Sequence, residues 1–384
     1  MVLECSSNVL SIIVETLTAG VLMLNYSRIS TPGIGAQAAR TLSTNHNRKE
    51  QTMESIQTQT LRSLSVRRGL FIGAAVNARA LRDDAAYRET LAREYNMLTP
   101  ENEMKFGSLV NEPNVYNFGP ADEILAFARA NDMSLRGHAL VWHNQNPEWL
   151  RPENFTRSQA IELLEKHIFT VVGHFHAKVY AWDVINEGLA EDGSLRDTFW
   201  MKTIGPEYFE YAFRFAREAD KNPRLFYNEY AADGLSPKAD GMYRLLKDLK
   251  EGGIPIDGVG LQMHFALYDS PNFAAPPSPE DLTANLNRLA ELGLEIHITE
   301  LDVQIQRQPG GREELLARQA QVYHELLDTV LQNRRLKAVV TWGFTDRHSW
   351  IPGFTGQPDW PLPFDEFYQP KPAYHAIYQA LEEE

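Results

Sequence analysis

Two glutamates are notable because each ends a short apolar run that has polar neighbours. Glu187 closes the run Trp182–Glu187, and Glu300 lies within His297–Asp302. A pair of carboxyl groups can divide acid–base and nucleophilic chemistry, since one donates a proton while the other attacks or activates water. We therefore take Glu187 and Glu300 as the candidate reactive pair.

Other polar and aromatic side chains repeat this placement at the ends of further apolar runs. In chain order they are Glu101, Asn102, Lys105, His138, Trp142, His143, Gln145, Asn228, Glu229, Gln262, His264, Trp342 and Trp350. Indoles stack on the apolar face of a pyranose ring, while amides and carboxylates bind its hydroxyl groups. This set favours a site for sugars, in which two carboxyl groups would cleave a glycosidic bond.

The elements that must position these residues alternate from Gly69 onward between β-rich runs and segments with helical spacing. The β-rich runs lie at 71–77, 96–99, 135–141, 179–185, 224–227, 258–264, 295–299 and 338–344. Two of the helices are predicted to begin at Ser236-Pro237 and Ser278-Pro279, where serine caps and proline takes the first helical position. A third is predicted to begin at Thr156, with Gln159 completing a capping box.

The strand runs are almost continuously apolar, which is typical of parallel strands buried on both faces. Eight such strands alternating with helices predict an α/β fold of the closed (β/α)8 TIM barrel type, with a doubly wound open sheet as the alternative. In such a barrel the polar residues above would meet at one mouth, at the carboxyl ends of the strands. Trp182 is expected to pack in the core, whereas His143 and Glu229 could serve either binding or structure.

Composition excludes several function classes. The 384-residue chain has one cysteine, Cys5, so it can form neither an intramolecular disulfide nor a cysteine-based zinc site. Its formal net charge of −14 disfavours nucleic acid and membrane surfaces as partners. The sequence contains neither a glycine-rich phosphate loop before a helix nor a G-x-S-x-G serine motif. His174 and His176 resemble a metal-ligand pair but fall late in a helical pattern, so we expect no metal and no cofactor.

Residues 1–62 read differently from the rest, and we expect an N-terminal extension before one catalytic domain over 63–384. The apolar stretch 9–24 is interrupted by an acidic residue and several hydroxyl residues, which makes it a weak membrane-span candidate. Ala36–Ala38 fits a signal-peptidase site, although a basic leading segment is missing. A degenerate export signal, an inert extension with Met53 as the true start, and an uncleaved anchor are the three interpretations.

Further motifs make the chain resemble glycoside hydrolase family 10, the endo-β-1,4-xylanases. Besides the two glutamate segments, the motifs in the family's order are Thr99–Lys105, Gly137–His143, Gly260–His264, Thr341–Gly343 and Asp346–Gly353. The resemblance covers about residues 65–382 and implies a (β/α)8 barrel that hydrolyses internal linkages of xylan with retention. It also implies xylan and xylo-oligosaccharides as partners. We expect a monomer, and a secreted one, because xylan cannot enter a cell.

Carried over residue by residue, the resemblance implies that Glu187 is the general acid/base and Glu300 the nucleophile. Asn186 matches the amide that touches the sugar 2-hydroxyl. His264 matches the imidazole bonded to the nucleophile, and Asp183 the carboxylate behind that imidazole. The implied substrate-binding residues are Glu101, Asn102, Lys105, His138, Trp142, Gln145, Asn228, Gln262, Trp342 and Trp350. Retention predicts that the two reactive carboxyl groups lie about 5–5.5 Å apart.

The sequence departs from the family pattern at three places. Phe106 stands where many members have tryptophan, and Ile185 replaces the commoner valine. Asn228–Ala231 reads Asn-Glu-Tyr-Ala where Asn-Asp-Tyr-Asn is more usual, which affects a contact on the leaving-group side. Two alternatives to a xylanase stay open: a barrel glycosidase that cleaves β-glucan or aryl xylosides, and a catalytically silent xylan-binding protein.

Overall fold

The computed structural model describes residues 59–267, 270, 273–306 and 310–383. They belong to a compact unit that spans Gln59–Glu384, so the unit begins before the predicted boundary at residue 63. Thr60 caps helix α2 (Leu61–Arg67), and Leu61 is fully buried. This first helix is therefore part of the barrel unit. The predictions for the export signal, the anchor and the start at Met53 lie outside the described residues.

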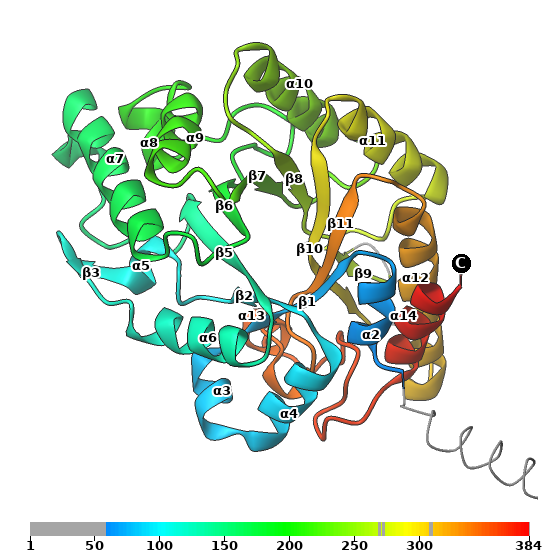
Figure 1. Ribbon diagram of the computed structural model, residues 1–384. Helices are drawn as coiled ribbons and strands as arrows, with labels where there is room; N and C mark the ends of the chain where they lie inside the picture. Colours follow the sequence, from blue (N-terminus) through cyan, green and yellow to red (C-terminus); the bar gives the residue numbers. More distant parts are fainter. Residues whose placement is uncertain (1–58, 268–269, 271–272, 307–309, 384) are drawn as a thin grey trace, which may run out of the picture. The chain divides into compact units, whose positions relative to one another are not determined.

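Eight parallel strands of the described chain close into a barrel (Figure 1). They are β1 (Phe71–Val76), β2 (Met97–Pro100), β5 (Ser134–Val141), β6 (Ala181–Asn186), β7 (Arg224–Glu229), β8 (Gly258–Leu261), β10 (Glu295–Gln304) and β11 (Leu336–Thr341). Each pairs with the next in this order, and β11 pairs with both β10 and β1, so the sheet closes on itself. The predicted (β/α)8 barrel is confirmed, and the open sheet is excluded.

Two smaller features add to the barrel. Strand β9 (His264–Ala266) follows β8 after two residues and pairs with the last part of β10, which places His264 beside Asp302. Strands β3 (Val110–Glu112) and β4 (Val115–Tyr116) form a separate antiparallel pair. The extension of the barrel wall by β9 matters for the site, because it carries an imidazole beyond the end of β8.

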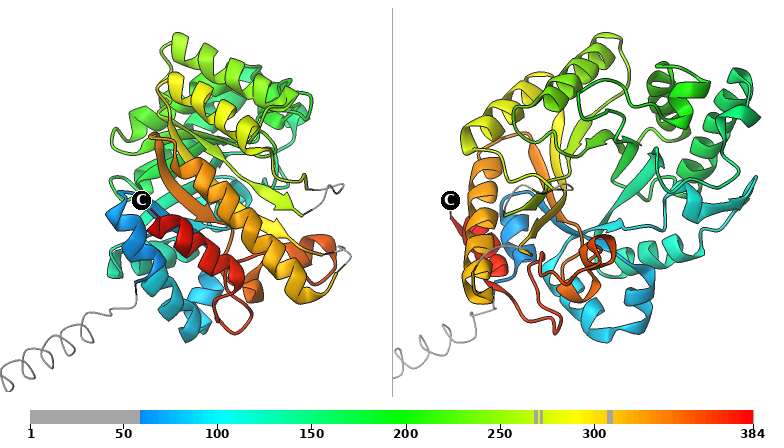
Figure 2. Two further views of the ribbon diagram at one scale, coloured as in Figure 1. Left: turned by 90° about the vertical axis from the view of Figure 1, so that its right-hand side faces the viewer. Right: turned by 180° about the vertical axis from the view of Figure 1, so that it is seen from behind.

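Helices cover the outside of the barrel (Figures 1 and 2). After α2 they are α3 (Ala78–Asp83), α4 (Ala85–Glu94), α5 (Phe106–Leu109), α6 (Gly119–Ala130), α7 (Arg157–His174), α8 (Phe199–Thr203), α9 (Tyr208–Ala219), α10 (Pro237–Glu251), α11 (Pro279–Glu291), α12 (Arg312–Leu331), α13 (Ile351–Thr355) and α14 (Pro372–Glu382), with 3-10 turns η1 (Pro152–Asn154) and η2 (Asp346–His348). The predicted caps are confirmed: Ser236 and Ser278 accept backbone N–H groups at the starts of α10 and α11, and Thr156 forms a capping box with Gln159 at α7.

The strands are buried along almost their whole length, as their apolar sequences predict. Trp182 on β6 is 1% exposed, and its ring lies against Gly137 of the neighbouring strand β5. A Cβ atom at Gly137 would meet the indole at 2.2 Å, so only glycine leaves room for this ring. The predicted packing role of Trp182 is confirmed.

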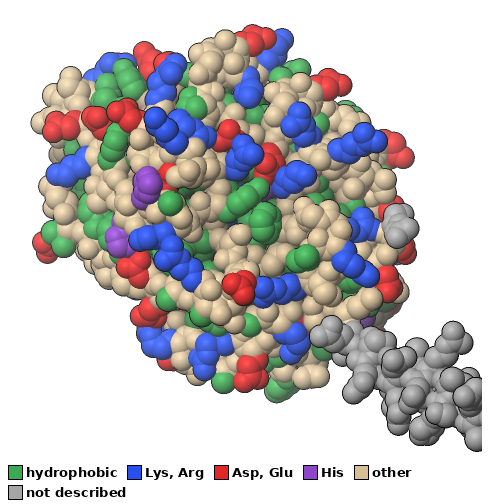
Figure 3. All heavy atoms as spheres, viewed as in Figure 1, with side chains coloured by type: hydrophobic (Ala, Val, Ile, Leu, Met, Phe, Trp, Pro, Cys, Tyr) green, Lys and Arg blue, Asp and Glu red, His purple; other side chains and the backbone are tan. Residues whose placement is uncertain are grey.

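The outer surface carries charges of both signs. On the face drawn in Figure 3, Lys and Arg side chains stand among Asp and Glu side chains over the helices. Among the described residues, no helix is long and apolar enough to cross a membrane.

Candidate active site

Glu187 and Glu300 come from two strands of the barrel, β6 and β10, that are separated by β7 and β8. Glu187 comes directly after β6 and has a positive φ of 56°, which is uncommon for a residue with a side chain. Its N–H donates to the carbonyl of Asn228 on β7 at 2.9 Å. Glu300 lies within β10, is 4% exposed, and donates its N–H to the carbonyl of Gln262 at 3.0 Å. Backbone pairing therefore fixes the main chain at both candidate carboxylates.

Amide side chains connect the two carboxylates. Asn228 Nδ2 donates to Glu300 Oε1 at 2.7 Å and to Asn186 Oδ1 at 2.9 Å. Gln262 Nε2 donates to the same Asn186 oxygen at 3.2 Å and to Glu187 Oε1 at 3.1 Å. The two carboxyl groups thus belong to one hydrogen-bond network that runs through three buried amides. Their predicted separation stays a prediction.

The surroundings of Glu300 suit an ionised nucleophile. His264 Nε2 lies 3.1 Å from Glu300 Oε2, and His264 Nδ1 lies 2.9 Å from Asp302 Oδ1. Burial by itself would raise the pKa of Glu300, but the hydrogen bond to His264 and the charges of His264 and His138 outweigh it and hold the pKa below its usual value. A carboxylate that stays ionised can attack an anomeric carbon.

The carboxyl of Glu187 has a different environment. Trp142 Nε1 donates to Glu187 Oε2 at 2.7 Å, and Gln262 holds the other oxygen. His143 Nδ1 lies 3.6 Å from Glu187 Oε2, and burial lowers the pKa of His143. His143 was left open between sugar binding and core packing; the ring is half-buried beside this carboxylate, so it is not a core histidine, and the sugar contact stays a prediction.

The prediction that Asp183 lies behind His264 is wrong, because Asp302 occupies that position. Asp183 accepts from Arg136 Nε at 3.1 Å and pairs with His138 Nδ1 at 3.0 Å. Burial would raise the pKa of Asp183, but the charge of Arg136 and the bond to His138 hold it below its usual value. Asp183 therefore neutralises a buried guanidinium and orients His138, and it makes no hydrogen bond to His264 in the described structure.

The predicted sugar contacts after β2 and β5 come together around one amine. Lys105 Nζ lies over the Trp142 ring at 4.8 Å and near the Trp342 ring at 5.8 Å, and it donates to Asn102 Oδ1 at 3.1 Å. Asn102 in turn donates to Glu101 Oε1 at 3.3 Å. Burial lowers the pKa of Lys105, although nearby carboxylates oppose this, and burial raises the pKa of Glu101. The group offers donors, acceptors and indole faces in one place.

Strand β11 and the loop that follows it complete this side of the site. The ring of Trp342 lies 5.1 Å from that of His138, edge to face. Trp350 donates its indole N–H to Asp302 Oδ2 at 2.9 Å, and its ring lies 5.2 Å from that of His264. Trp350 is thus connected through Asp302 to His264, which bonds to Glu300. Gln145 is exposed on the loop after β5.

Burial corrects one further prediction and decides one that was left open. Asn228 was predicted to bind sugar, but it is fully buried, both its amide hydrogens bind Asn186 and Glu300, and its carbonyl accepts from Thr299 Oγ1 at 2.7 Å. Glu229, left open between binding and support, is also fully buried and pairs with Lys238 at 3.1 Å. Both residues position others rather than face a substrate.

Sequence reasoning missed several residues that complete the site. Asp302 lay inside a quoted motif without a role, and Arg136, Thr299 and Tyr227 were not singled out. A usable signal existed for Asp302, because it follows Glu300 by two residues and so shares its face of the strand. The side chains of Arg136 and Tyr227 could be placed only by packing.

His174 belongs to the pair of histidines whose spacing resembles that of metal ligands. His174 Nε2 lies 2.8 Å from Asp122 Oδ1 and its ring stacks on Phe118 at 3.9 Å, as expected for a histidine at the edge of the core. Among the described residues, no group of three or more His, Cys, Asp or Glu side chains could hold a metal ion.

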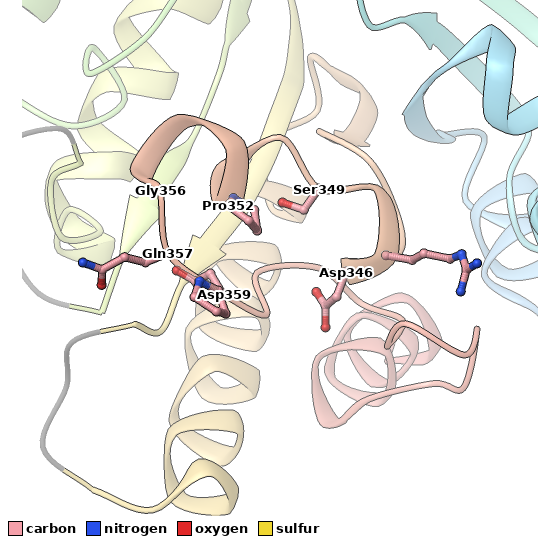
Figure 4. A pocket seen from close by; sticks show the side chains of 8 residues that line it. Asp346, Ser349, Pro352, Gly356, Gln357 and Asp359 are labelled. Carbon is pink, nitrogen blue, oxygen red and sulfur yellow. The ribbon is translucent and has the colours of Figure 1, made fainter.

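A separate hollow of about 470 Å³ lies beside η2 and α13 (Figure 4). It is lined by Asp346, Arg347, Ser349, Pro352, Gly356, Gln357, Pro358 and Asp359. This lining shares no residue with the described hydrogen-bond network of the two glutamates. Buried Asp346 pairs with Lys371 at 2.8 Å, an arrangement that secures the last loop.

The barrel and its paired carboxylates at the strand ends define a barrel glycoside hydrolase. The family model "Glycosyl hydrolase family 10" matches residues 60–380, and the chain belongs to this family. Endo-1,4-β-xylanase B of Thermotoga neapolitana is 42% identical over 325 residues, covering 84% of this chain and 92% of the relative.

Solved structures agree with this membership. Native xylanase 10B of Thermotoga maritima has 44% identity and a TM-score of 0.80, over 84% of this chain and 98% of that one. Xylanase 10B of Thermotoga petrophila, solved in complex with xylobiose, has 42% identity and a TM-score of 0.81, over 85% of this chain and 98% of that one.

Proposed function

We propose that this protein is a retaining endo-1,4-β-xylanase, with Glu300 as nucleophile and Glu187 as general acid/base. The observation that carries the proposal is the pairing of a buried carboxylate kept ionised by His264 with a second carboxyl group in the same amide network. The relatives named above are xylanases, and the one from Thermotoga petrophila was solved with xylobiose bound.

In the first step, Glu300 attacks the anomeric carbon while Glu187 protonates the departing glycosidic oxygen. This forms a glycosyl-enzyme ester and releases the reducing-side fragment. In the second step, Glu187 removes a proton from water, the water attacks the same carbon, and Glu300 leaves as a carboxylate. Two inversions give net retention at the anomeric centre.

The supporting residues have separable tasks in this mechanism. Lys105, Asn102 and Glu101 would bind hydroxyl groups of the sugars on the non-reducing side, and Trp342 would offer an indole face. Asn186 has its Nδ2 3.3 Å from Glu187 Oε1, between the reactive carboxyl groups, where it could reach the sugar 2-hydroxyl.

Reducing-sugar release from xylan and from carboxymethylcellulose tests the proposal. We expect release from xylan with little from carboxymethylcellulose, and the β-anomer as the first product by NMR. Preferred hydrolysis of carboxymethylcellulose would favour the β-glucan alternative. Binding to xylan with no release from either polymer would favour the silent xylan-binding protein.

We further propose that the enzyme is a secreted monomer. A polymeric substrate outside the cell supports export, and one barrel carries all the predicted site residues. Sequencing the mature N-terminus from culture medium and from cells tests export. Size-exclusion chromatography with light scattering tests the monomer, for which the sequence mass is 43.7 kDa.

A further inference from the structure

The main chain just after Glu187 is held by side chains of the neighbouring strand β7. Gly188 N–H donates to the hydroxyl of Tyr227 at 3.1 Å, and Leu189 N–H donates to Glu229 Oε2 at 3.2 Å. The Tyr227 hydroxyl donates to the same Glu229 oxygen at 2.5 Å. The backbone N–H groups of the two residues after Glu187 therefore both donate to one buried tyrosine–glutamate pair.

This pair is fully enclosed by protein. Tyr227 and Glu229 are both 0% exposed, and Lys238 at the start of α10 is 2% exposed. Lys238 Nζ lies 3.1 Å from Glu229 Oε1 and 3.2 Å from the centre of the Tyr230 ring. A buried carboxylate is costly unless it is paired and hydrogen-bonded, and Glu229 has both the ion pair with Lys238 and hydrogen bonds from Tyr227 and Leu189.

What the cluster maintains is an unusual backbone conformation. A non-glycine residue at positive φ, such as Glu187 at 56°, costs about 1 kcal/mol or more and persists only where its surroundings enforce it. Arg196 holds the same turn from the other side, since its Nε donates to the Glu187 carbonyl at 3.0 Å. The direction in which the Glu187 carboxyl points depends on this turn.

We propose that Glu229, together with Tyr227 and Lys238, is a positioning device that sets the reach of the Glu187 carboxyl toward the leaving-group oxygen. The inference rests on the proposed acid/base role of Glu187 and adds residues that never touch the substrate. The chain reads Asn-Glu-Tyr-Ala at 228–231, so the glutamate of the device lies within one of its departures from the family pattern.

The test compares two substrates that differ in their need for an acid. Glu229→Gln and Tyr227→Phe are assayed for kcat/KM on xylan and on a xylobioside with a dinitrophenyl leaving group, which departs without protonation. We expect a loss of about 10- to 100-fold on xylan from a small misplacement of the acid, and near wild-type values on the activated substrate.

The chain offers a matched control in Glu94 and Tyr374. Glu94 is 4% exposed, accepts the N–H of Leu61 at 3.1 Å and the hydroxyl of Tyr374 at 3.0 Å, and pairs with Arg93. Glu94→Gln and Tyr374→Phe therefore disturb the same kind of cluster away from the site. We expect equal kcat/KM losses on both substrates for these controls, or none.

The outcomes separate the inference from the function on which it rests. If Glu187→Ala shows the substrate split while the Glu229 and Tyr227 variants lose both activities equally or neither, the positioning role is wrong and the acid/base assignment stands. If Glu187→Ala keeps wild-type turnover on xylan, the acid/base assignment itself is wrong. Should Glu229→Gln fail to fold, Tyr227→Phe decides alone, since it removes one oxygen.

Discussion

His264 Nε2 lies 3.1 Å from Oε2 of Glu300, on the side of the ring away from Asp302. Burial alone would lower the pKa of this imidazole, but the charge and hydrogen bond of Asp302, joined by Glu300, raise it to about 10. The ring is therefore a cation across the neutral range, and a cation beside the nucleophile favours its ionised form.

Replacing Asp302 by asparagine should move the acid limb of the pH profile. Asparagine has nearly the shape of aspartate but lacks the charge that raises the pKa of His264. The pKa of His264 therefore falls, and the ring stabilises the ionised form of Glu300 less. The pKa of Glu300 then rises, and the nucleophile becomes protonated at a higher pH than in the wild type. We expect the acid limb of kcat/KM on xylan to shift upward by about one pH unit.

Asp83→Asn provides the control, because Asp83 is an exposed partner of Arg79 on α3. Its profile should overlay that of the wild type. An acid limb that stays in place in Asp302→Asn would contradict the proposed electrostatic path through His264.

Removing the nucleophile should abolish turnover. In Glu300→Gly the covalent glycosyl-enzyme cannot form, and we expect kcat on xylan to fall by about 10³-fold or more. The assay is reducing-sugar release, with circular dichroism to verify the fold. Wild-type turnover in this variant would refute the double-displacement mechanism.

Removing the carboxyl group of Glu187 should lower kcat/KM most for substrates whose leaving group needs a proton. In Glu187→Ala the glycosidic oxygen of xylan lacks its proton donor, and general acid catalysis is worth about 10²–10⁴-fold. A dinitrophenyl xylobioside needs no such proton and should retain a large part of its kcat/KM. Equal losses on both substrates would count against the acid assignment.

The sequence was sufficient to predict the barrel and to place Glu187 and Glu300 in one candidate site. Parallel strands that are buried on both faces are continuously apolar, so their ends are visible wherever polar residues begin. Because all eight carboxyl ends meet at one mouth, Glu187 and Glu300 could be paired although they lie far apart in the chain. The helix starts at Ser236 and Ser278 could also be predicted, because a helix cap depends on residues close in the chain.

Asp183 was misassigned because its partner depends on strand register. It lies opposite His138 across the β5–β6 pairing, whereas Asp302 lies opposite His264 across β9–β10. Both aspartates are buried carboxylates near strand ends, and their residue type alone does not distinguish them. Asn228 was misread for a related reason: it lies opposite Asn186 in register, which turns its amide into the interior.

The corrected role of Asp183 predicts a large loss of stability. In Asp183→Asn the guanidinium of Arg136, itself fully buried, loses the counter-charge it binds. Leaving one charge of a buried pair unpaired lowers the free energy of unfolding by about 3–5 kcal/mol. Urea unfolding measures this change.

Glu123→Gln is the control, because Glu123 pairs with Arg82 on the exposed surface at 2.7 Å. A surface pair of this kind is worth about 1 kcal/mol or less. A loss in Asp183→Asn no larger than in the control would mean that the buried pair adds nothing to stability.

The contact between Gly137 and Trp182 gives a prediction about the barrel itself. In Gly137→Ala the new Cβ would lie 2.2 Å from the indole, so the ring or strand β5 must shift within a packed interior. Overpacking of this kind lowers the free energy of unfolding by about 1–3 kcal/mol. The matched substitution Gly173→Ala is at an exposed position of α7, where the added carbon would meet no atom within 4 Å beyond its own helix backbone and chain neighbours, and it should stabilise by up to about 1 kcal/mol. Denaturant unfolding of both variants should therefore shift in opposite directions, and a shift in the same direction would contradict the packing role of Gly137.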